Sequence, residues 1–70
     1  MSTDELLNFC QASQGCHCCI TTRGGKQYSG ELVSYNTSST LLNTTIQIII
    51  WDDNRPYEFD QQEIFKIEKL

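Results

Sequence analysis

The side chains most capable of chemistry in this 70-residue chain are Cys16-His17-Cys18-Cys19, with Cys10 upstream. Thiolates and imidazoles bind zinc, and zinc sites usually draw them from two pairs, each spaced about two to four residues apart across a turn. On an extended strand, Cys16 and Cys18 would face one side, and His17 and Cys19 the other. No second Cys or His pair follows. The pattern therefore indicates buried free thiols, at Cys10 and Cys18 with Cys16 as a further candidate, and we expect no metal and no cofactor.

The remaining reactive groups do not assemble into a recognisable catalytic motif either. His17 and an adjacent cysteine would point apart on a strand, so they form no nucleophile–base pair. Asp52-Asp53 lie in a segment rich in Asp and Asn, which is typical of a turn that bonds its own backbone. Gly24-Gly25 are followed by Lys26 and a strand, so no helix N-terminus completes a phosphate loop. We expect no enzymatic activity.

The elements that must position these residues begin with a short helix, predicted over 2–13. Ser2 and Glu5 form a capping box, and the acidic first turn suits the positive end of the helix dipole. Gly15 is a plausible stop signal. One face of this helix carries a narrow apolar stripe made of Leu6, Phe9, Cys10 and Ser13. So short a helix must pack on something.

From Cys16 onward the composition favours strands, with Gly, Asn and Asp at the breaks. We expect strands near 16–23, 27–36 and 40–51, a fourth strand with Tyr57 and Phe59 on one face, and a fifth at 64–67, where a helix is also possible. The turns would fall at Gly24-Gly25, 37–39, 52–56 and 60–62. The predicted fold class is mainly β: a single domain over 1–70, with a helix at about 2–13 and a strongly bent, five-stranded antiparallel barrel of the Sm/SH3 type at about 16–70.

The charge of the chain argues against non-specific binding of nucleic acid. The formal net charge is −4, and the five cationic residues are scattered as Arg23, Lys26, Arg55, Lys66 and Lys69. Proteins that bind polyanions without specificity concentrate Lys and Arg on one face. Any RNA contact would therefore depend on stacking and on hydrogen bonds to bases.

The sequence also bears on location. No apolar run approaches the ~20 residues that a membrane-spanning helix needs. The acidic start Met1-Ser2-Thr3-Asp4-Glu5 is unlike a secretory signal peptide. We therefore expect a cytoplasmic protein that does not enter a membrane.

The most informative segment is Gly30-Glu31-Leu32-Val33-Ser34-Tyr35, in which a glycine interrupts an apolar strand. This pattern resembles the first motif of the Sm and Sm-like (LSm, Hfq) family: Gly30, Leu32 and Tyr35 match its glycine, core aliphatic and core aromatic. The resemblance covers nearly the whole chain. It implies a ring-forming module that contacts single-stranded RNA at its inner rim, through Tyr35, Asn36, Ser38 and Thr40. The family's second motif, an Arg-Gly or Lys-His signature before the last strand, would fall near Asp60-Gln61-Gln62, where the chain has no basic residue and so departs from the family.

A bent five-stranded sheet leaves two edges with unpaired backbone groups, which a natural protein has to protect. Here only Pro56 and the lysines of the last strand could do so. Pairing between copies satisfies both edges and closes a ring when each contact repeats a fixed rotation. The resemblance to Sm-like proteins implies roughly five to seven copies. The residues predicted at the subunit interface are Trp51, Tyr57, Phe59, Phe65 and Ile67.

A second resemblance leads to a different function. Small acidic Rof-like inhibitors of the Rho termination factor also combine a leading helix with an acidic Sm-like barrel, and they act as monomers on a protein. The net charge of −4 suits that behaviour. The alternative is thus an acidic module that binds a protein and modulates a nucleic-acid enzyme such as a transcription terminator. A purely structural assembly protein is a third possibility.

Overall fold

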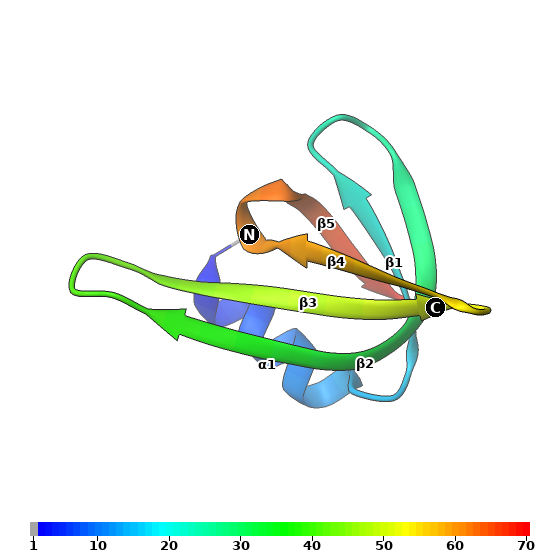
Figure 1. Cartoon of the computed structure of the whole chain (residues 1–70), viewed down its shortest axis with the longest axis horizontal. Helices are drawn as coiled ribbons and strands as arrows, with labels where there is room; N and C mark the ends of the chain where they lie inside the picture. Colours follow the sequence, from blue (N-terminus) through cyan, green and yellow to red (C-terminus); the bar gives the residue numbers. More distant parts are fainter. Residues whose placement is uncertain (1) are drawn as a thin grey trace.

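A computed structural model describes residues 2–70 and shows one helix followed by five antiparallel strands in a single bent sheet (Figure 1). The sheet order is β4-β3-β2-β1-β5, so β4 and β5 occupy opposite edges although they are consecutive in the chain. This confirms the predicted fold class. The elements are α1 (Thr3–Ser13), β1 (His17–Thr22), β2 (Gln27–Ser39), β3 (Thr44–Asp52), β4 (Arg55–Asp60), the 3₁₀ helix η1 (Gln61–Glu63) and β5 (Ile64–Lys69).

Helix α1 begins and ends where its sequence predicts. The hydroxyl of Ser2 accepts a hydrogen bond from the backbone N–H of Glu5 at 3.2 Å, which satisfies one of the free donors of the first turn. Gly15 follows the helix with a φ of 86°, a left-handed conformation that glycine adopts without strain. The buried face of α1 consists of Leu6, Cys10 and Ser13, so the predicted stripe is confirmed at these three positions.

Strand β2 is strongly bent (Figure 1), and at Gly30 the backbone of β3 approaches it closely. An added Cβ at this position would lie 2.3 Å from the carbonyl oxygen of Trp51 on β3, closer than any real contact. The ring of Tyr28, just before the bend, lies 5.2 Å from the rings of Tyr57 and Phe59 on β4. Since β3 separates β2 from β4 in the sheet, this contact requires the sheet to curl over itself.

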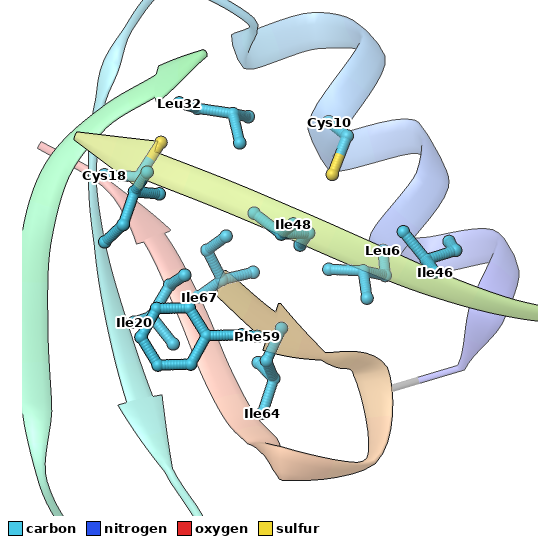
Figure 2. Packing of buried hydrophobic residues seen from close by; sticks show 11 residues of the cluster. Leu6, Cys10, Cys18, Ile20, Leu32, Ile46, Ile48, Phe59, Ile64 and Ile67 are labelled. Atoms are coloured by element: carbon cyan, nitrogen blue, oxygen red, sulfur yellow. The ribbon is translucent and has the colours of Figure 1, made fainter. Parts of the chain in front are cut away.

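The core fills the inside of this curl, and α1 covers it from one side (Figure 2). Burial of these side chains is the main source of stability for so small a domain. Every strand contributes to it. The core consists of Leu6, Cys10, Cys18, Ile20, Leu32, Ile46, Ile48, Ile50, Phe59, Ile64 and Ile67.

The β2–β3 hairpin corrects one sequence prediction. The polar segment 37–39, predicted as a loop, continues β2, and the turn is formed by residues 40–43, which were predicted to start the third strand. Thr40 fixes this turn, because its N–H donates to the carbonyl of Asn43 at 2.7 Å and its hydroxyl accepts from the N–H of Asn43 at 3.1 Å. Thr and Ser suit both strands and turns, so composition alone did not place the boundary. Figure 1 shows the hairpin extending beyond the rest of the sheet.

Candidate binding surfaces

The cysteine-rich segment is a structural part of the core. Cys10 and Cys18 are fully buried, as predicted, whereas Cys16 and Cys19 are partly buried and His17 is exposed. Burial raises the pKa of the Cys10 thiol to about 11 and also raises the pKa of Cys18. Both thiols are therefore protonated and weakly nucleophilic near neutral pH. Within residues 2–70, no three His, Cys, Asp or Glu side chains gather closely enough to hold a metal ion.

The four residues predicted to contact RNA do not form one site. Tyr35 lies directly opposite Ile48, whose side chain is in the core, so Tyr35 points to the inner face and packs there. Asn36 and Ser38 alternate with it and lie on the outer face, exposed. The hydroxyl of Thr40 is occupied within the hairpin turn. Only Asn36 and Ser38 are thus available together.

The outer face supplies Asn36 and Ser38 with partners that sequence reasoning missed. Gln47 lies directly opposite Asn36, and Thr45 lies opposite Ser38. The side-chain amide of Gln47 donates to the carboxylate of Asp60 at 3.0 Å. A hollow at this end of the sheet is lined by Thr45, Gln47, Asp60, Gln61 and Gln62. We call the exposed uncharged side chains of this region the neutral polar patch: Asn36, Ser38, Thr45, Gln47 and Gln62.

Beside this patch, Gln61 ties three elements together. Its amide nitrogen donates to the hydroxyl of Thr3 on α1 at 2.8 Å, and its amide oxygen accepts from the backbone N–H of Ile46 on β3 at 3.2 Å. Arg23 holds the same turn from the β1–β2 loop, since its Nε donates to the carbonyl of Gln62 at 2.6 Å and its N–H to the carbonyl of Glu63 at 3.0 Å. The polar groups of Gln61 and Arg23 are therefore used in holding the turn beside the patch, and we do not count these two residues as part of the neutral polar patch.

The predicted interface residues divide into two groups. Phe59 and Ile67 are 5% and 6% exposed and belong to the core, so they have almost no surface left for another subunit. Tyr57 is partly buried against Tyr28. Trp51 is 42% exposed but lies on β3, inside the sheet, whereas Phe65 is 61% exposed on edge strand β5. Phe65 is the predicted interface residue that combines exposure with a place on an edge.

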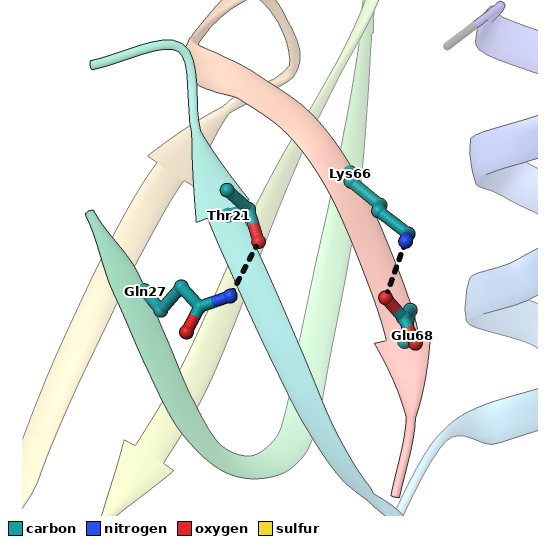
Figure 3. A network of polar contacts seen from close by, with 4 residues as sticks. All are labelled: Thr21, Gln27, Lys66 and Glu68. Atoms are coloured by element: carbon teal, nitrogen blue, oxygen red, sulfur yellow. Dashed lines mark hydrogen bonds and ion pairs between the residues drawn. The ribbon is translucent and has the colours of Figure 1, made fainter. Parts of the chain in front are cut away.

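The two edge strands carry opposite charge. β4 carries one cationic residue, Arg55, and two acidic residues, Glu58 and Asp60. β5 carries two cationic residues, Lys66 and Lys69, and one acidic residue, Glu68. Lys66 and Glu68 form an ion pair of 2.7 Å along β5 (Figure 3), which raises the pKa of Lys66 through the hydrogen bond and the charge of Glu68. Both groups are well exposed, so this pair adds little stability.

The β2–β3 hairpin is uncharged over most of its length and exposes two leucines at its tip. No charged residue occurs from Leu32 to Trp51, and the two leucines at its tip, Leu41 and Leu42, are almost fully exposed.

Within residues 2–70, no helix is long and apolar enough to cross a membrane.

Comparisons of this chain with protein-family models, with curated proteins and with solved structures find no match.

Proposed function

We propose that this protein is a binding module that assembles through its strand edges, with β4 of one copy pairing with β5 of the next. The observation that carries the proposal is that β4 and β5 each pair with one strand only, on opposite edges of the same sheet. An unprotected edge is a template for another strand. The two edges differ from each other, so the contact is head-to-tail and closes into a ring when the rotation permits.

Charge supports the same pairing. The acidic excess of β4 would meet the basic excess of β5, whereas pairing of two β4 edges or two β5 edges would bring like charges together. Phe65 would gain apolar cover from the neighbouring copy. Such a ring is the architecture that the resemblance to Sm-like proteins implies.

The ligand we propose for this assembly is single-stranded RNA, bound at the neutral polar patch. Amide groups such as those of Asn36 and Gln47 present a donor and an acceptor side by side, which suits the edges of unstacked bases. A net charge of −4 leaves little phosphate neutralisation, so the affinity should depend only weakly on salt.

Assembly is tested by a charge placed on the β5 edge. Phe65→Glu should convert the oligomer to an 8.0-kDa monomer in light scattering, because it brings a carboxylate against the acidic β4 edge. The matched control is Leu41→Glu, which also replaces an exposed apolar residue by a carboxylate, but in the turn between β2 and β3 and outside both edge strands. An oligomer that survives Phe65→Glu, or that dissociates equally with Leu41→Glu, would contradict edge pairing.

RNA binding is tested by fluorescence anisotropy with labelled oligo(U) and oligo(A). The double variant Asn36→Ala, Gln47→Ala should lose binding while keeping the mass of the assembly. Asn8→Ala removes an exposed amide from α1 and should bind as the wild type does. No binding by the wild type at low salt would refute the RNA proposal and leave assembly untouched.

The net charge of −4 specifically favours a second candidate, an acidic module that binds a protein. It predicts a monomer that binds no oligonucleotide and that a basic partner protein retains. The light-scattering and anisotropy measurements above separate the two candidates.

A further inference from the structure

A second surface lies at the opposite end of the outer face, around the single tryptophan of the chain. A depression there is lined by His17, Glu31, Val33, Trp51 and Asp53. His17 lies directly opposite Glu31 on the neighbouring strand, and Glu31 directly opposite Trp51. These three side chains therefore stand in one row across β1, β2 and β3, on the face away from the core.

The backbone around this depression is paired within the sheet. Trp51 lies on a strand with paired neighbours on both sides, and its carbonyl is in close contact with the backbone at Gly30. Asp53 occupies the turn after β3 with a φ of 55°, a left-handed conformation that Asp and Asn tolerate better than most residues. The indole remains 42% exposed, so the fold leaves a large aromatic side chain open to a ligand.

The chemistry of the lining indicates a cation. An exposed indole attracts a positive charge over its face, and two carboxylates beside it add direct ion pairs. None of the five Lys and Arg residues of the chain lines the depression. The two carboxylates would repel a phosphate, so the lining favours a cation over the backbone of a nucleic acid.

We propose that this depression binds an arginine side chain of a partner protein. A planar guanidinium can stack on the indole of Trp51 while its N–H groups reach Glu31 or Asp53, whereas the ammonium of lysine offers only a point charge. Val33 would contact the methylene stem. The site does not depend on edge pairing or on RNA binding. It uses two of the acidic residues of the chain, Glu31 and Asp53, to bind a cationic partner.

Because Trp51 is the only tryptophan, its fluorescence reports binding at this site directly. The probe is the blocked peptide acetyl-Gly-Arg-Gly-amide, titrated at low salt against the same peptide with lysine or with citrulline, the uncharged analogue of arginine. We expect a saturable change with arginine, binding roughly 2- to 5-fold weaker with lysine, and none with citrulline.

Variants of the two carboxylates complete the test. Glu31→Gln and Asp53→Asn should each weaken arginine binding by roughly 3- to 10-fold, since each removes one ion pair. Asn accepts the left-handed conformation of residue 53, so that variant should fold normally. Asp4→Asn, which neutralises an exposed carboxylate on α1, is the matched control and should bind as the wild type does. Equal binding of arginine and citrulline, no saturable change, or equal effects of Asp53→Asn and Asp4→Asn would overturn the proposal.

Discussion

Replacing Gly30 by alanine should break the bend on which the whole sheet depends. The Cβ of residue 30 would lie 2.3 Å from the carbonyl oxygen and 2.7 Å from the carbonyl carbon of Trp51. Both are backbone atoms of the neighbouring strand. No side chain can turn aside to relieve the clash, so the backbones of β2 and β3 would have to separate at Gly30.

The cost can be set against the total stability of the domain. Forcing extra atoms into a packed site costs about 1 to 3 kcal/mol, and a clash with backbone belongs at the upper end of that range or above. A domain of 70 residues has an unfolding free energy of about 4 to 10 kcal/mol in total. At about 4 to 8 °C per kcal/mol for a domain of this size, we expect Gly30→Ala to lower the Tm by at least about 12 °C.

Thermal and urea unfolding followed by circular dichroism measure this change. The matched control is Gly24→Ala in the β1–β2 turn, where the added Cβ meets only the hydroxyl of Thr22 at 3.9 Å. That variant should keep the wild-type Tm or exceed it, because alanine restricts the unfolded chain. If Gly30→Ala were as stable as Gly24→Ala, the close approach of β2 and β3 would be wrong.

Two further predictions concern the bridging amide of Gln61 and the buried thiol of Cys10. Gln61→Ala removes the hydrogen bonds to Thr3 and Ile46 and should lower the free energy of urea unfolding by about 1 to 2 kcal/mol. Gln62→Ala should stay within about 0.5 kcal/mol of the wild type, because Arg23 bonds the backbone carbonyl of residue 62, which the variant keeps. Equal losses in the two variants would refute the bridging role of Gln61. Folding raises the pKa of the Cys10 thiol from 9.0 to about 11. The contribution of this thiol to the unfolding free energy is therefore complete below pH 9 and is lost as the pH rises to 11. In Cys10→Ala the unfolding free energy should lack this part of the decline with pH, about 2 to 3 kcal/mol, and an unchanged pH dependence would contradict it.

The parts of the fold that were predictable from sequence are those set by local signals. Ser2 and Glu5 define the start of α1 through a contact three residues apart. Gly30 indicates a bend because glycine in a strand is unfavourable unless backbone approaches closely. The hairpin boundary was not predictable in this way, because Ser and Thr at 37–40 suit a strand and a turn equally.

The candidate site was harder to predict because a bulge reverses the alternation along β2. Leu32 pairs with Ile50 and Ser34 with Ile49, so Val33 is an extra residue in the strand. Strict alternation from Leu32, a core residue, would point Tyr35 outward and Asn36 inward, the reverse of the structure. The partners of Asn36 come from the pairing register with β3, which one sequence does not disclose. The burial of Phe59 and Ile67 likewise depends on the curl of the sheet.

The measurement that tests edge pairing most directly is the mass of the purified wild-type protein in solution, by light scattering at micromolar concentration. Pairing of β4 with β5 between copies predicts a discrete assembly of several 8.0-kDa chains, and the resemblance to Sm-like proteins implies roughly five to seven of them. A single species of 8.0 kDa at every concentration tested would contradict it.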